Sequence, residues 1–143
     1  PEHLALYDPA DLRLGLFYED GGVTYTGKFN SEFGNLSVIR IAEMYLIRAE
    51  CNVRLGTAVG ASPEDDYNMT HTRAGLPAEA SVTLDDVLLE RRLELAFEGF
   101  KIHDIKRLHG MVGTMNYDDN KLVYPIPQSE IEINPELEQN PGY

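Results

Sequence analysis

The chain has 143 residues, the size of one ordinary domain, and its 43% hydrophobic content is sufficient for a packed core. The formal net charge of -12, from 24 acidic and 12 basic residues, disfavours nucleic acid and anionic lipid surfaces as partners, because both carry phosphates that bind Lys and Arg. The single cysteine, Cys51, excludes an intrachain disulfide, and no apolar run approaches the roughly 20 residues that span a bilayer.

The first segment, residues 1–36, has no sustained helical or strand period. It is rich in Gly, Asp, Asn and aromatic residues, which is typical of loops. Val23–Thr26 follows the pair Gly21-Gly22 and could form a short strand, so we expect an irregular lead-in with one hairpin.

A helix is predicted from residue 37 to residue 55, with Gly56 as its C-terminal stop. Its apolar residues cover more than half of its circumference, so we expect it to contact neighbours on several sides and to bury Cys51. Arg48 and Asn52 lie four residues apart within this apolar arc, which predicts a buried polar pair.

Two more helices begin at recognisable caps. Ser62 and Pro63 have the residue types of an N-cap and a first helical position, and this helix is expected to run to about residue 73. Thr83 with Asp86 three residues later is an acidic variant of the capping box. The pattern that follows predicts a helix continuing through Glu98.

A fourth, shorter helix is predicted over residues 102–108, followed by a loop and a Pro- and Asn-rich tail. Successive helices joined by short turns form antiparallel hairpins, the unit of helical-repeat proteins. We therefore expect an all-α fold of tetratricopeptide-like helical hairpins over residues 37–109. The irregular lead-in 1–36 and the C-terminal loop and tail 110–143 are expected to pack on this scaffold as parts of one domain.

Several helix and turn motifs follow one another in a distinctive order and spacing. Together they resemble the C-terminal part of the SusD-like (RagB/SusD) family of outer-membrane nutrient-binding lipoproteins. His71 and Lys101 depart from this pattern, because the family usually has Arg at both positions. The motifs are RIAEMYLIRAE at 40–50, RAGLP at 73–77, ERRLELAFEG at 90–99, HDIKR at 103–107, LVYPIPQSEI at 122–131 and QNPGY at 139–143.

The resemblance implies a tetratricopeptide-like scaffold and a location at the outer membrane, on the cell surface of a Gram-negative bacterium. It implies a SusC-like TonB-dependent transporter as partner and a glycan, or sometimes a peptide, as ligand. The only membrane attachment it implies is a lipid anchor in an N-terminal portion outside this chain. The residues that carry the structural signature are Arg40, Glu43, Glu50, Arg73, Glu90, Arg91, Glu94, Glu98, Asp104, Arg107, Pro125 and Pro127.

Glu90, Glu94 and Glu98 follow one another at four-residue steps, and paired carboxylates can catalyse glycoside hydrolysis. However, Arg91 lies among them and Arg92 borders them. We favour an ion-pair lattice that holds this helix against the one carrying Arg40, Glu43 and Glu50. We therefore expect no enzyme and assign no catalytic residue.

The sequence indicates neither a metal nor a cofactor. Its four histidines lack the spacing of a helical zinc site, and no phosphate-binding glycine loop is present.

Glycan capture usually requires exposed aromatic rings that pack on sugar C–H groups. The chain has no Trp but 8 Tyr, of which Tyr18, Tyr25 and Tyr117 lie in polar loops and are the candidate ligand-binding residues. The favoured function is non-catalytic capture of an oligosaccharide or polysaccharide for delivery to the transporter. The alternatives are a helical-repeat adaptor that binds a protein or peptide in a groove, and a glycan-degrading enzyme with two carboxylates in a cleft.

Overall fold

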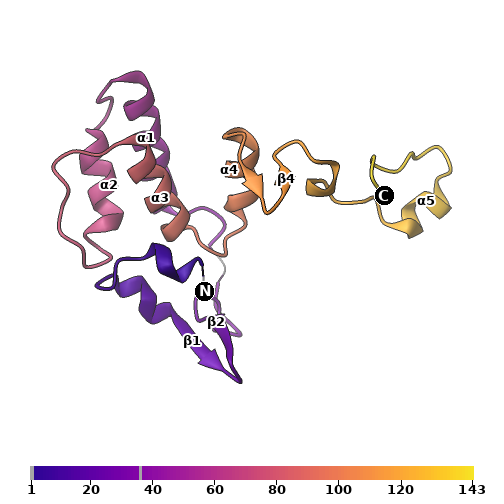
Figure 1. The fold of residues 1–143 in the computed structure, drawn as a ribbon, viewed down its shortest axis with the longest axis horizontal. Coiled ribbons are helices and arrows are strands. Elements are labelled where there is room, and N and C mark those ends of the chain that lie inside the picture. Colours follow the sequence, from indigo (N-terminus) through magenta and orange to yellow (C-terminus); the bar gives the residue numbers. More distant parts are fainter. Residues whose placement is uncertain (1, 36) are drawn as a thin grey trace. The chain divides into compact units, whose positions relative to one another are not determined.

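The computed structural model describes residues 2–35 and 37–143 (Figure 1). Pro1 and Leu36, the outermost residues of the expected lead-in, lie outside the described residues. The chain divides into two compact units, Pro1–Leu95 and Ala96–Tyr143. Helices are the main secondary structure of the described residues and strands are short, as the sequence predicts. The segment limits at 36 and 109 remain predictions.

The first unit is built on three helices that pack against one another, which confirms the expected helical hairpins. Ala49, Tyr67 and Val87 form the centre of the core, one from each helix. Each helix contributes a small or flat side chain there, so the three axes can approach closely. The helices are α1 (Ile41–Leu55), α2 (Pro63–His71) and α3 (Leu84–Glu94).

Three of the helix ends match the sequence signals, but α1 begins at Ile41 rather than at the predicted residue 37. Gly56 ends α1 in the left-handed conformation at φ 62°, where a side chain would be strained. The Ser62 hydroxyl accepts a hydrogen bond from the Asp65 N–H at 3.1 Å. Thr83 and Asp86 form a complete capping box at the start of α3.

The end of α3 differs from the prediction. The helix stops at Glu94, Phe97 has a positive φ of 66°, and Glu98 lies in a turn rather than on the face of Glu90 and Glu94. The carbonyl of Glu94 instead accepts hydrogen bonds from Lys28 at 2.8 Å and from Arg40 at 3.3 Å. These side chains satisfy the carbonyl that a longer helix would have used, which accounts for the early end.

The predicted burial of Cys51 is wrong, because its side chain is exposed. It shares one side of α1 with Ile41, Met44 and Leu55, which are 67%, 40% and 73% exposed. The cause is that α2 and α3 cover only the opposite side of α1, whose apolar arc is wider than two neighbours can bury.

The predicted pairing of Arg48 with Asn52 is also wrong. Asn52 is buried and binds the loop after α1, donating to the carbonyls of Val59 at 3.2 Å and Ala61 at 3.0 Å. Arg48 reaches α2 and makes two hydrogen bonds of 2.7 Å with Asp66. Both side chains are satisfied, but by partners outside their own helix.

The lead-in contains a hairpin, as expected from the Gly pair. The strands β1 (Phe17–Asp20) and β2 (Val23–Thr26) pair in antiparallel register. Gly21 and Gly22 form the turn with φ of 57° and 79°, the pair of positive values that a two-residue hairpin favours. Two 3-10 helices precede the hairpin, η1 (Leu4–Leu6) and η2 (Leu12–Leu16).

The second unit begins with α4 (Phe100–Arg107), close to the predicted helix. Gln139, in the tail, bonds both backbone groups of Ile126, accepting from its N–H at 2.8 Å and donating to its carbonyl at 2.9 Å. The helix within the tail was not predicted. The other elements are β3 (Met111–Val112), β4 (Met115–Asn116), η3 (Asn120–Leu122) and α5 (Gln128–Ile133). None of the helices in the described parts of the chain combines the length and apolarity needed to cross a bilayer.

Candidate functional site

Two of the three candidate tyrosines form one aromatic surface on the hairpin. Tyr18 and Tyr25 face each other across the two strands, and their rings stack with centroids 5.7 Å apart and planes inclined by 24°. They are 46% and 45% exposed, so part of each ring is open to solvent. A neighbouring pair of partly open rings can pack on the C–H face of a sugar.

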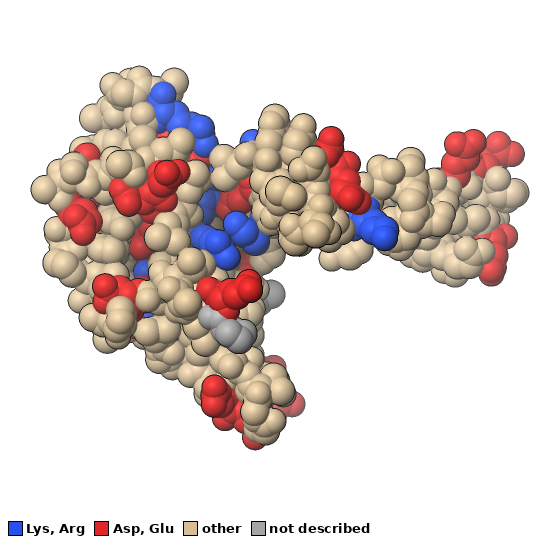
Figure 2. All heavy atoms as spheres, viewed as in Figure 1, with Lys and Arg blue, Asp and Glu red and all other residues tan. Residues whose placement is uncertain are grey.

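The tip of the hairpin is acidic. Side chains alternate between the two faces of a strand, so Asp20 and Val23 share the face of the tyrosine pair while Glu19 lies on the other. All three are exposed, and Figure 2 shows acidic side chains gathered at the hairpin tip. A ligand on the tyrosine pair therefore lies close to negative charge.

The segment that leads into the hairpin is fixed by a buried ion cluster. Arg13, in η2, makes two hydrogen bonds to Asp11 from its Nε and Nη2 atoms, the shorter at 2.7 Å. The same guanidinium reaches α3, where it contacts Glu90 at 2.7 Å and Glu94 at 3.3 Å. Burial acts to lower the pKa of Arg13, but hydrogen bonds to Asp11 and Glu90 outweigh it and the pKa is raised.

Glu94 is the centre of this cluster. Its carboxylate is also paired with Arg40, which precedes α1, and with Arg73, which follows α2. Among the described residues the cluster therefore balances three carboxylates against three guanidiniums. The balance matters because a carboxylate only 1% exposed, like that of Glu94, is costly to keep charged without partners.

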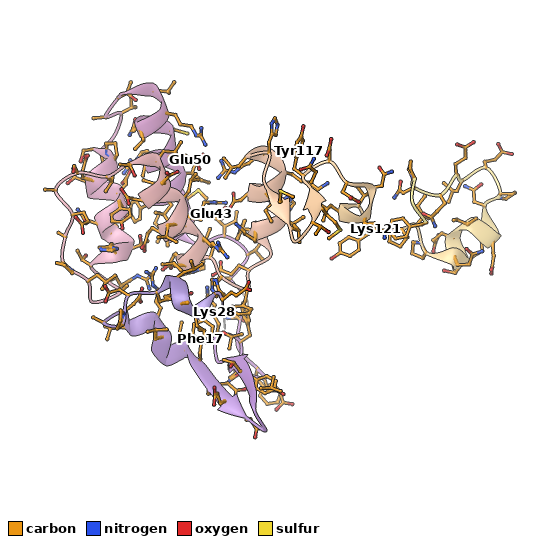
Figure 3. The ribbon with its side chains drawn as sticks, in the orientation of Figure 1. Phe17, Lys28, Glu43, Glu50, Tyr117 and Lys121 are labelled. Carbon is orange, nitrogen blue, oxygen red and sulfur yellow. The ribbon has the colours of Figure 1, made fainter. Side chains whose placement is uncertain are left out.

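The expected ion-pair lattice is confirmed in part. Arg40 pairs with Glu94, and Arg91 contacts Glu43 on α1 at 3.3 Å (Figure 3 labels Glu43). Glu50 bonds Arg54 within α1 at 2.8 Å, as their i,i+4 spacing favours.

Glu90 has two partners that were not predicted, Arg13 and His71. His71, at a position where the family usually has Arg, contacts it at 3.3 Å. Arg13 lies 77 residues away in a segment without periodicity, so no sequence pattern indicated the pair. The buried and paired state of Glu90 and Glu94 favours a structural role over an acid–base role in hydrolysis.

The third candidate, Tyr117, belongs to the second unit. Its ring stacks on His109 with centroids 4.2 Å apart and planes inclined by 13°, which covers one face (Figure 3 labels Tyr117). In the same unit Asp104 accepts a hydrogen bond from Arg107 at 2.8 Å, the local pair indicated by their spacing.

Tyr124, which was not among the predicted candidates, is 93% exposed between the motif residues Val123 and Pro125. Its carbonyl accepts a hydrogen bond from Asn140 at 2.7 Å. Pro127, the other motif proline, precedes α5 as its N-cap residue. Across residues 2–35 and 37–143, no group of His, Cys, Asp and Glu side chains is arranged to hold a metal ion.

Comparison with known proteins gives consistent matches. The model of the SusD family matches residues 23–123. A SusD-like protein of Formosa agariphila is 30% identical over 126 residues, covering 76% of this chain and 25% of its own length. A solved structure of a putative sugar binding protein from Bacteroides vulgatus is 29% identical with a TM-score of 0.79, and the match covers 99% of this chain and 38% of that one. The surface glycan-binding protein A of Bacteroides uniformis is 25% identical with a TM-score of 0.73, covering 97% of this chain and 39% of that one.

The chain thus spans a quarter of the curated relative's length and under two fifths of either of these two solved structures. The matches cover the scaffold helices and the strand β2 together. The fold that they share is the helical, tetratricopeptide-like one seen in the first unit.

Proposed function

The chain belongs to the SusD family, and from this premise we propose that it takes part in binding a glycan without changing it chemically. The observation that carries the proposal is the stacked, partly exposed pair Tyr18 and Tyr25. Sugar rings present C–H groups that pack on aromatic faces, and the phenolic hydroxyl groups can donate to or accept from sugar hydroxyls.

The pair is suited to this role because of how it is held. A two-residue turn and four registered residue pairs fix the strands, so the rings need little further ordering when a ligand binds. Tyr117, stacked on His109 in the second unit, is proposed as a separate glycan contact. Glu90 and Glu94, the paired carboxylates of α3 that the sequence singles out for hydrolysis, are buried in ion pairs, which supports binding rather than hydrolysis.

The wider role follows from family membership. We propose that the whole protein works at the outer membrane, on the cell surface of a Gram-negative bacterium, and delivers its glycan to a SusC-like TonB-dependent transporter. One relative's name describes it as a surface glycan-binding protein, which agrees with this proposal.

The test is calorimetric titration of the chain with neutral plant, host and microbial hexasaccharides. We expect at least one to bind, and the joint variant Tyr18→Ala, Tyr25→Ala to weaken it by at least roughly tenfold, since a ring stacked on a ligand contributes about 1 kcal/mol. Tyr143→Ala serves as the control because this ring, 54% exposed, bonds the carbonyl of Val123 in the tail. Binding that survives loss of both hairpin rings would contradict the assigned site, and peptide binding without glycan binding would favour the adaptor function.

A further inference from the structure

The hairpin that carries Tyr18 and Tyr25 is joined to the helices from both sides at one residue. The incoming side is η2, whose Arg13 contacts the Glu94 carboxylate at 3.3 Å. The outgoing side is Lys28, two residues after β2, whose Nζ donates to the Glu94 carbonyl at 2.8 Å. One residue of α3 thus binds the chain before the hairpin and after it.

Other contacts close the base of the hairpin. The Gly27 N–H donates to the Leu16 carbonyl at 2.6 Å, which joins the two sides directly before Phe17 and after Thr26. Phe17 meets the ring of Tyr7 edge to face at 5.7 Å, and Tyr7 donates to the carbonyl of Leu93 at 3.1 Å. Figure 3 shows Phe17 and Lys28 at the inner end of the hairpin, where these contacts lie.

The negative charge at the end of α3 explains why these contacts converge on Glu94. Glu94 is the last residue of α3, and the carbonyls at a helix C-terminus carry partial negative charge. Its side chain adds a full negative charge at the same place. Cations therefore converge there from the lead-in, from the segment before α1 and from the segment after α2. The cations are Arg13, Lys28, Arg40 and Arg73.

We propose that Glu94 is the positioning residue of the tyrosine pair: it holds both sides of the hairpin so that Tyr18 and Tyr25 remain stacked and aimed at the ligand. The part of this proposal that concerns the ligand rests on the proposed function, whereas the part that concerns the stacking of the two rings does not. It gives the buried ion cluster a role in binding in addition to its role in stability.

The test compares two variants that alter the contacts at Glu94 with two matched controls. Lys28→Met removes the outgoing contact and Glu94→Gln removes the carboxylate charge. Arg54→Met removes a cation that pairs with Glu50 within α1, and Asp66→Asn changes a buried carboxylate that binds Arg48 between α1 and α2. The controls match the test variants in chemistry but lie on helices, away from the hairpin contacts.

The first readout is the nuclear Overhauser contact between the Tyr18 and Tyr25 rings, measured without ligand. We expect Lys28→Met and Glu94→Gln to weaken it while both controls retain it, even where Asp66→Asn lowers the melting temperature. The proposal would be overturned if the ring contact is unchanged in Lys28→Met and Glu94→Gln, or if Asp66→Asn loses it to the same extent. Absence of the contact in the parent chain would overturn it as well.

The second readout is the affinity for neutral hexasaccharides. We expect Lys28→Met to weaken binding by about threefold to tenfold, as for the loss of one net hydrogen bond, and Arg54→Met to leave it unchanged. If the parent chain binds no hexasaccharide, the proposed function fails, while the ring contact still decides whether Glu94 positions the pair. If the parent binds and Lys28→Met binds equally well, the positioning role is wrong although glycan binding stands.

Discussion

The hydroxyl of Tyr7 donates a hydrogen bond of 3.1 Å to the carbonyl of Leu93, which lies 86 residues further along the chain. This bond joins η1 to the last turn of α3. Burial is the largest cause that raises the pKa of Tyr7, and the result is about 12 instead of 10.0. The folded state therefore favours the neutral phenol more strongly than the unfolded state does.

Tyr7→Phe is expected to lower the free energy of unfolding by about 1 kcal/mol at pH 7, since one buried hydrogen bond is lost. The stabilisation from the neutral phenol is fully present below pH 10 and is lost as the pH rises toward 12. The difference in the free energy of unfolding between parent and variant should therefore decrease over that range. Urea denaturation at a series of pH values measures it, and a constant difference from pH 9 to pH 12 would contradict the assignment.

Arg13→Met should be severely destabilising. It would leave Asp11 and Glu90, both nearly inaccessible, without their guanidinium, and uncompensated buried charge costs about 3–5 kcal/mol. Arg54→Met removes an arginine that is 42% exposed and pairs with the single carboxylate of Glu50, so it should cost less, about 1 kcal/mol. Thermal unfolding of both variants gives the comparison, and equal melting temperatures would show that the cluster contributes little.

Thr83→Ala should cost about 1 kcal/mol at pH 7, the usual effect of losing an N-cap. The Thr83 hydroxyl and backbone N–H hold the pKa of Asp86 below its ordinary 3.8. The stability that this carboxylate contributes is present above pH 3.8 and is lost as the pH falls through its lowered pKa. The difference between parent and variant should narrow in acid.

Ser62→Ala is the matched control for that cap, because Ser62 binds the Asp65 backbone and no carboxylate. Its cost should stay constant over the same acid range. Denaturation from pH 2 to pH 7 distinguishes the two caps, and parallel curves would show that Asp86 does not act through Thr83.

Much of the scaffold could be predicted because its signals are local. Gly56, Ser62 and the Thr83–Asp86 box fix helix ends through their own backbone neighbours. The pair Arg91–Glu43 could be predicted because periodicity places the two residues on facing sides of two helices, and Arg40, which pairs with Glu94, lies directly before the first of these helices.

The remaining errors arise from contacts between segments far apart in the sequence. α3 ends at Glu94 because Lys28 and Arg40 bind its carbonyl, and nothing within residues 84–98 indicates this. The stacking of Tyr18 on Tyr25 could have been anticipated from the Gly21-Gly22 turn, since a two-residue loop sets that register. The partners of Glu90 could not have been anticipated, because Arg13 lies in a segment without helical or strand periodicity.

A charged glycan should bind less well than a neutral one of the same length. Glu19 and Asp20 are exposed at the hairpin tip, and the chain as a whole carries -12. Sulfated or uronic hexasaccharides should therefore bind more weakly, and the gap should close as salt rises, because the Debye length falls to about 10 Å at 0.1 M.

The double variant Glu19→Gln, Asp20→Asn should reduce the difference in affinity between neutral and anionic hexasaccharides at low salt. Asp85→Asn, an exposed acid at the start of α3, should not. Titration of both oligosaccharide types against the three proteins measures the effect. Stronger binding of the anionic ligand by the parent chain would show that the acidic tip does not face it.

Cys51 provides a direct test of the uncovered side of α1. Its thiol is exposed, so in the native chain it should react with a water-soluble thiol reagent at a rate close to that in denaturant. Ala49 lies two residues earlier, fully buried in the core against α2 and α3. A Cys51→Ser, Ala49→Cys variant should therefore react only as fast as the chain unfolds. Should Cys51 in the parent chain be protected instead, and become reactive on dilution, copies of the chain cover the apolar side of α1 by associating with one another.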